Sequence, residues 1–198
     1  MTQQITSKDL QKDCETAGWS SNVARAVDTD QKNVMEVLER AAAHKGTSFV
    51  EIYQNCHIFN DGVFERVSGK RVCDDNRVML EHGQLLVFGN QRDKGLRLNG
   101  VAPEVVSLTV GLHTVDDLIV HDEKAPGTGM AYLLSQMRPP QFPVPMGIFR
   151  DVEEPSFQEL VASKLAKARP VIDERKSSPP DADQWDGVEG KLKHLEIE

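Results

Sequence analysis

Two apolar strand patterns, one on each side of an amphipathic helix pattern, constrain the fold of this chain most. Residues 23–27 alternate as a short strand does, and residues 48–53 read as a second, buried strand. Between them, apolar residues recur at helical spacing after an Asp-Thr-Asp segment that supplies N-cap candidates. Parallel strands need a crossover of this kind, so the pattern predicts one β-α-β unit with a parallel strand pair.

The second strand leads to Cys56, which we place at the strand's carboxyl end. Ligands of open α/β sheets bind beyond the carboxyl ends of the strands, so Cys56 is a candidate for chemistry. Its thiolate is the type of ligand that holds iron–sulfur clusters, although a cysteine here is more often a small buried hydrophobic residue. His57 follows directly, but adjacent residues on a strand point to opposite faces, which disfavours a thiol–imidazole pair.

Three further segments contain groups that bind ions. Asn60-Asp61-Gly62 is a turn signature whose side-chain oxygens suit Mg²⁺, and a plain tight turn is the commoner role. The loop 92–97 carries cationic groups for an anionic substrate or partner, or is simply solvated. Residues 121–124 mix both charges but lack a companion set of metal ligands. Neither Cys14 nor Cys73 has neighbouring ligands, so we interpret both as incidental thiols.

The remainder of the chain predicts a β-rich segment followed by helices. Short strands broken by turns fill residues 65 to about 110, and apolar spacing predicts a helix around residues 130–137. Pro139–Pro145 reads as an extended connector. A capping box at Ser156–Glu159 opens a second helix, which we expect to end at Arg169-Pro170. We therefore divide the chain into four parts. These are an irregular leader (1–22), a partial α/β domain (23–64), an extension (65–170) and a charged, disordered tail (171–198).

Composition excludes several classes of partner. The net charge of -8 over 198 residues argues against nucleic acid and against an anionic membrane surface. No apolar run reaches the ~20 residues of a membrane span, and the first residues lack the apolar core of a secretory signal. The 3 cysteines are far apart and form no disulfide framework. These features predict a cytoplasmic protein.

Several separated motifs resemble the β subunit of the 2-oxoacid:ferredoxin oxidoreductases, most closely the longer forms that act on 2-oxoglutarate. The resemblance runs from about Val23 to Arg169. Its pieces, in order, are the segments 46–56 and 59–62, His82-Gly83, Phe88-Gly89, and the segments 94–98, 120–124 and 142–150.

The resemblance implies a thiamine-diphosphate-binding fold, of which residues 23–64 are the last β-α-β unit. It implies that Cys56 is one ligand of a [4Fe-4S] cluster, and that thiamine diphosphate and Mg²⁺ are bound in the complete enzyme. The activity is then oxidative decarboxylation of a 2-oxoacid to acyl-coenzyme A and CO₂, with an α subunit and ferredoxin as partners. Asn60 and Asp61 are the residues that we assign to the cofactor.

The sequence contains neither the CxxC element nor the GDGD motif that the family uses for the cluster and the diphosphate. We therefore expect a C-terminal portion of a β subunit, from a truncated or split gene or a miscalled start, that is inactive alone. The alternatives are a non-catalytic module that binds the α subunit, an inactive remnant, and a stand-alone thiol enzyme that uses Cys56 and His57.

Overall fold

The computed structural model describes residues 21–109 and 114–176. The chain forms two compact units, residues 1–154 and 155–198. The first unit contains a four-stranded and a three-stranded sheet, so the fold is α/β with both parallel and antiparallel pairing. None of the helices in the described ranges has the length and apolar character of a membrane span.

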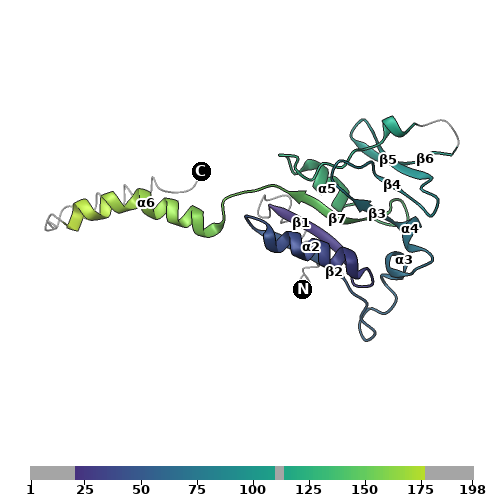
Figure 1. Cartoon of the computed structure of the whole chain (residues 1–198), viewed down its shortest axis with the longest axis horizontal. Coiled ribbons are helices and arrows are strands. Elements are labelled where there is room, and N and C mark those ends of the chain that lie inside the picture. Colours follow the sequence, from purple (N-terminus) through teal and green to yellow (C-terminus); the bar gives the residue numbers. More distant parts are fainter. Residues whose placement is uncertain (1–20, 110–113, 177–198) are drawn as a thin grey trace, which may run out of the picture. The chain divides into compact units, whose positions relative to one another are not determined.

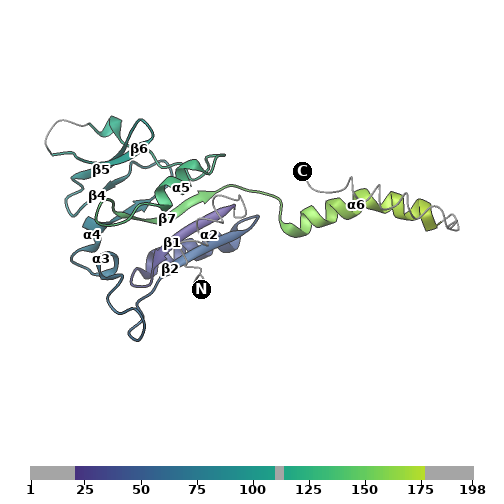
Figure 2. The same ribbon diagram turned by 180° about the vertical axis from the view of Figure 1, so that it is seen from behind.

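The predicted β-α-β unit is confirmed. Strand β1 (Asn22–Val27) pairs in parallel with β2 (Ser48–Tyr53), and α2 (Gln31–Ala43) connects them. Helix α2 begins where the side chain of Asp30 accepts a hydrogen bond from the backbone N–H of Asn33 at 3.2 Å. In Figure 1 the helix lies in front of these two strands, and in Figure 2 it lies behind them.

The prediction that residues 48–53 form a buried strand was wrong. The sheet order is β2-β1-β7-β3, so β2 is an edge strand that pairs on one side only. Glu51, at 6% exposure, is its one buried residue, whereas Ile52 is 41% exposed. An apolar sequence is therefore present on a strand whose outer edge has no partner in this unit as the structure describes it.

The centre of the sheet contains a strand that sequence patterns did not predict. Strand β7 (Val144–Asp151) runs antiparallel to β1 and parallel to β3 (Arg77–Leu80), and all of its residues are buried. The last two residues of the connector predicted for Pro139–Pro145 therefore belong to a strand instead. Proline is tolerated there because pairing with β1 stops at Gly147, so the missing N–H of Pro145 breaks no bond to β1.

Two apolar layers cover the main sheet. On one face, Val37 of α2 packs against Ala24, Ala26 and Ile148. On the other face, Val23 and Phe149 share a core with Leu134 of α5 (Gly129–Ser135) and with Leu86 and Leu96 from the small-sheet region. Alternation along β1 explains this division, because successive residues of a strand point to opposite faces.

The β-rich segment predicted for residues 65 to about 110 is confirmed in part: three of its short strands form an antiparallel sheet, whereas β3 joins the main sheet and two short helices precede it. Hydrogen bonds from its central strand join both neighbours. The strands are β4 (Val87–Phe88), β5 (Lys94–Asn99) and β6 (Ala102–Ser107), and the short helices of this unit are α3 (Glu65–Ser68), α4 (Cys73–Asn76) and η1 (Val115–Asp117).

In the second unit, helix α6 (Phe157–Lys176) begins at the predicted capping box. Ser156 and Glu159 exchange hydrogen bonds between their side chains and backbone N–H groups, at 2.8 and 3.3 Å. The predicted end at Arg169-Pro170 was wrong, because the helix continues to Lys176. An interior proline removes one hydrogen bond without ending the helix when helix-forming residues continue beyond it. The rest of the predicted tail, from residue 177, and the leader 1–20 lie outside the described residues.

Candidate functional site

The segment between β2 and α3 projects as a loop (Figures 1 and 2), and Cys56 belongs to this segment. Strand β2 ends at Tyr53, so Cys56 is not the strand-end residue that the sequence predicted but stands three residues beyond it. The backbone N–H of Asn60 donates to the carbonyl of Cys56 at 2.9 Å and closes the turn. Gly62 follows with a φ of 75°, a conformation that favours glycine, so the predicted Asn-Asp-Gly turn is confirmed.

The side chain of Asn55 holds this loop closed. Its Nδ2 donates to Oδ1 of Asp61 at 2.9 Å, and its Oδ1 accepts from the backbone N–H of Gly62 at 2.9 Å. The amide that precedes Cys56 thus bonds two successive residues that follow it, and so closes the turn. Sequence reasoning assigned no role to Asn55, and its position one residue before Cys56 was the only available signal.

The loop stabilises the thiolate form of Cys56. Hydrogen bonds from the backbone N–H groups of Phe59 and Ile58, and a weaker one from Asn60, lower the pKa of the thiol below its usual value. Partial burial and the charge of Asp61 act in the opposite direction but do not outweigh them. Successive N–H groups directed at one atom form an anion-binding nest, and a thiolate is the form of cysteine that binds metals.

Cys73 has the opposite environment. It is buried on α4, with Sγ 3.5 Å from Oδ1 of Asp74, and burial raises its pKa. The interpretation of Cys73 as an incidental thiol agrees with this setting. Cys14 lies outside the described residues. Of the two cysteines that the structure describes, Cys56 is the one suited to ligand chemistry.

The proposed Mg²⁺ ligands Asn60 and Asp61 lie on the same loop. Asp61 Oδ1 accepts from Asn55 and lies 3.2 Å from Nδ1 of His57, so its carboxylate is already used inside the turn. The ring of His57 is exposed and directed to Asp61. The described residues contain no cluster of three or more His, Cys, Asp or Glu side chains that could hold a metal ion. The loop as described therefore offers one thiolate and one carboxylate, not a complete ligand set.

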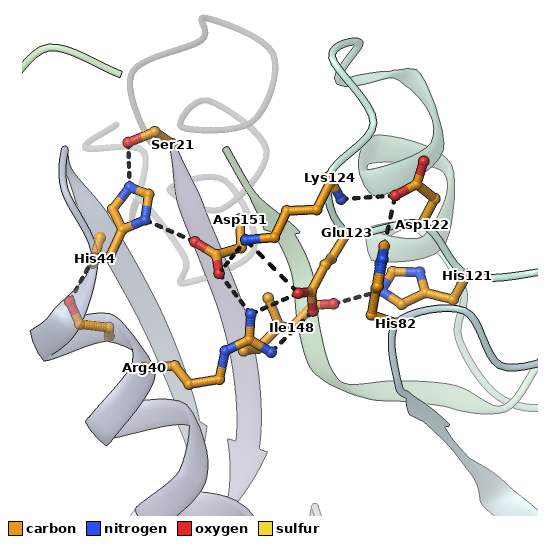
Figure 3. A network of polar contacts seen from close by, with 12 residues as sticks. Ser21, Arg40, His44, His82, His121, Asp122, Glu123, Lys124, Ile148 and Asp151 are labelled. Atoms are coloured by element: carbon orange, nitrogen blue, oxygen red, sulfur yellow. Dashed lines mark hydrogen bonds and ion pairs between the residues drawn. The ribbon is translucent and has the colours of Figure 1, made fainter. Parts of the chain in front are cut away.

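The charged segment 121–124 is part of a structural network (Figure 3). The guanidinium of Arg40 donates to both oxygens of Glu123, at 3.0 and 2.6 Å, and to Asp151 at 2.6 Å. Lys124 also reaches Asp151, at 2.9 Å. His121 is buried and its Nε2–H donates to the carbonyl of Ile148 at 2.7 Å. These contacts join α2 to β7 and leave no open metal site in the segment.

His44 extends the same network to Ser21, the residue before β1. Its Nδ1–H donates to Asp151 at 2.7 Å, and its Nε2 lies 2.7 Å from Oγ of Ser21 (Figure 3). Burial favours a raised pKa for Asp151, but the hydrogen bonds from Lys124 and Arg40 and the charge of Lys124 outweigh it and hold that pKa far below its usual value. The partners are 23 to 111 positions apart in the sequence, which is why local patterns did not predict them.

Comparison with known proteins shows a substantial relationship to a curated enzyme subunit. Over 148 residues, 74% of its length, the chain is 33% identical to the 2-oxoglutarate oxidoreductase subunit KorB of Mycobacterium tuberculosis (strain ATCC 25618 / H37Rv). The match covers 39% of that protein, so the chain spans about two fifths of the length of the curated relative.

Two further matches are weaker. A family model described as a domain of unknown function, DUF3470, matches residues 163–196. A solved 2-oxoglutarate:ferredoxin oxidoreductase from Magnetococcus marinus, with 2-oxoglutarate, coenzyme A and succinyl-CoA bound, aligns with 90% of this chain and 41% of its own, at 17% identity and a TM-score of 0.42. That likeness is too low to support an argument about the fold. On the sequence relationship, the chain is a relative of the 2-oxoacid:ferredoxin oxidoreductase β subunits and corresponds to a C-terminal portion of one.

Proposed function

We propose that this chain acts as part of the β subunit of a 2-oxoacid:ferredoxin oxidoreductase, with 2-oxoglutarate as substrate. The observation that carries the proposal is the 33% identity to a 2-oxoglutarate oxidoreductase subunit over most of the chain. The reaction is oxidative decarboxylation of the 2-oxoacid, with coenzyme A as acyl acceptor and ferredoxin as electron acceptor. An α subunit and the rest of the β subunit complete the enzyme.

In this proposal Cys56 is one ligand of the [4Fe-4S] cluster. Its environment fits that role, because the N–H groups of Phe59 and Ile58 favour a thiolate and hydrogen bonds to cluster sulfurs tune such centres. The cluster, when bound, carries single electrons from the substrate to ferredoxin. One thiolate does not hold a cluster, so the other three cysteines come from protein that the described residues do not include.

The β1-α2-β2 unit is proposed as part of a thiamine-diphosphate-binding domain. Its two parallel strands both end beside the Cys56 loop, which is the usual ligand-binding end of such strands. Asn60 and Asp61 are proposed to contact Mg²⁺ or the diphosphate there. For Asp61 this requires exchange of its present hydrogen bonds to Asn55 and His57.

An exposed surface supports the need for further protein. Ile58 and Phe59 on the loop are 83% and 89% exposed, and Ile52 on the neighbouring edge strand is 41% exposed. An unpaired strand edge beside exposed apolar side chains is the usual form of a protein contact surface. We propose that the remainder of the β subunit covers it, and that the chain by itself is inactive.

The same surface supports a second candidate function, a non-catalytic module that binds an α subunit. Both proposals predict complex formation, but only the enzymatic one requires Cys56. A thiol enzyme built on Cys56 and His57 has weaker support, because the His57 ring is directed to Asp61.

The experiment is reconstitution with the α subunit and with the N-terminal part of a related β subunit that carries the missing motifs. Electron paramagnetic resonance of the reduced complex reports the cluster, and ferredoxin reduction reports turnover. Cys56→Ser is expected to abolish or shift the cluster signal, while the matched control Cys73→Ser keeps it. Complex formation with no cluster signal in the unsubstituted chain would leave only the interaction module.

A further inference from the structure

A pocket of about 330 Å³ lies beside the base of the Cys56 loop, at the carboxyl ends of β1 and β2. Residues from β2, from the start of α3 and from the segment after α5 form its wall. The side chains that matter for its chemistry are Arg25, Tyr53, Phe64, Arg66, Met137 and Arg138. None of these residues has a role in the proposed binding of the cluster, the Mg²⁺ ion or the diphosphate.

The pocket has a surplus of positive charge. Three arginines line it, and the charge of one, the buried Arg25, is balanced by Glu51 at 2.7 Å. Among the residues that the structure describes, no acidic side chain forms an ion pair with Arg66 or Arg138. Two exposed arginines therefore line one small cavity, and neither has an ion-pair partner in the described part of the chain.

Two aromatic side chains also line the pocket. The rings of Tyr53 and Phe64 stack with centres 4.4 Å apart. Burial raises the pKa of Tyr53, and the charges of Arg25 and Arg138 partly oppose this shift. The guanidinium of Arg138 thus acts on the same space that the two rings border.

We propose that this pocket binds the oxyanion of a small organic ligand, a carboxylate or phosphate group with a short apolar body. Guanidinium groups bind both kinds of oxyanion through paired hydrogen bonds, and the stacked rings provide the contact for carbon atoms. A pocket near 330 Å³ is at the small end of ligand sites, so the body has few atoms. The proposal does not depend on the role of Cys56.

The test is calorimetric titration of the full chain with 2-oxoglutarate and, separately, with inorganic phosphate, at constant ionic strength. We expect saturable binding at one site for at least one anion. Arg66→Gln and Arg138→Gln are each expected to weaken binding tenfold or more. The matched control is Arg71→Gln, since Arg71 is an exposed arginine close to α3 that does not line the pocket, and it should change Kd less than twofold.

The two ligands separate the two sources of an oxyanion. Binding of 2-oxoglutarate alone identifies a carboxylate site, and comparable binding of phosphate identifies a site for a phosphate-bearing ligand.

Arg138→Lys keeps the positive charge but removes the paired hydrogen bonds of a guanidinium. The Arg138→Lys protein should therefore bind the anion with intermediate affinity. Amide NMR shifts of Met137 and Arg138 during the titration locate the site independently of the variants. No saturable binding of either anion, or equal weakening by Arg71→Gln, would overturn the proposal. Cys56→Ser should leave the binding unchanged, because Cys56 does not line the pocket.

Discussion

Arg25 and Glu51 occupy paired positions on β1 and β2, and Nε of Arg25 lies 2.7 Å from Oε2 of Glu51. Both side chains are buried. The guanidinium also lies 5.2 Å from the ring centre of Tyr53 and 5.0 Å from that of Phe149. This ion pair connects the edge strand to the sheet and places one arginine at the inner wall of the oxyanion pocket.

Glu51→Ala is expected to destabilise the first unit by about 3–5 kcal/mol, because it removes the carboxylate that lies 2.7 Å from the buried guanidinium of Arg25. Urea unfolding followed by circular dichroism measures the loss. Glu36→Ala, at an exposed position of α2, is the control and should change the free energy of unfolding by no more than about 0.5 kcal/mol. The apolar double variant Arg25→Met with Glu51→Leu should recover most of the loss. Equal destabilisation by the single and double variants would contradict this account.

The network around Asp151 predicts acid sensitivity. Its pKa is lowered in the folded protein, so its contribution to stability is complete above the pKa of an unfolded aspartate, about 3.9. That contribution is lost as the pH falls from about 4 towards the folded pKa. Asp151→Asn should therefore lower stability at pH 7 and flatten its dependence on pH in the acid range. The free energy of unfolding, measured between pH 3 and pH 7, gives both effects.

The control for Asp151 is Asp116→Asn, which alters an exposed aspartate outside the network. It should leave both the stability at pH 7 and the acid slope unchanged. If Asp151→Asn retains the full acid slope, other carboxylates must account for it and the network has no such role.

Cys56 and Cys73 should differ sharply as nucleophiles. Backbone N–H groups lower the pKa of Cys56, and burial raises that of Cys73. Because the thiolate is the reactive form, Cys56 should react with iodoacetamide at lower pH and much faster than Cys73. Peptide mass spectrometry of samples alkylated between pH 6 and pH 9 measures both rates in one protein.

Asn55→Ala tests whether the loop causes this reactivity. Without the amide, the hydrogen bonds to Asp61 and Gly62 are lost and the turn no longer holds its N–H groups at the sulfur. The pH at which Cys56 reacts at half its maximal rate should rise, while the rate for Cys73 stays the same. An unchanged profile would show that the turn forms without Asn55.

Local sequence patterns predicted the parts of this fold that depend on neighbouring residues. The β1-α2-β2 unit, the capping box at Ser156 and the turn at Asn60 all follow from spacing and residue type over a few positions. The central strand β7 did not, because its buried residues include Pro145 and Gly147 and lack the alternation of a strand. Its place is set by pairing with β1, more than 100 residues away.

The site shows the same division. Cys56 was identified from its motif, whereas Asn55, Arg25 and Arg40 gained their roles only from the folded structure. Arg40 contacts Glu123 and Asp151 across 83 and 111 positions. No periodic pattern relates such residues. The burial of Ser48–Tyr53 was predicted wrongly for a related reason. Its apolar residues are typical of an interior strand, and only the sheet order shows that β2 lies at the edge.

Gly147 is the position in β7 where we expect the least tolerance of a side chain. Its φ is 111°, and a Cβ atom there would lie 2.7 Å from the carbonyl oxygen of Leu80 on β3. Gly147 also reverses the alternation of β7, which directs Met146 and Ile148 to different apolar clusters. Gly147→Ala should cost more than about 1 kcal/mol and lower the melting temperature by several degrees. Gly127→Ala is the control, because its added Cβ meets no atom within 4 Å; equal melting temperatures for the two variants would mean that β7 adjusts at Gly147 without strain.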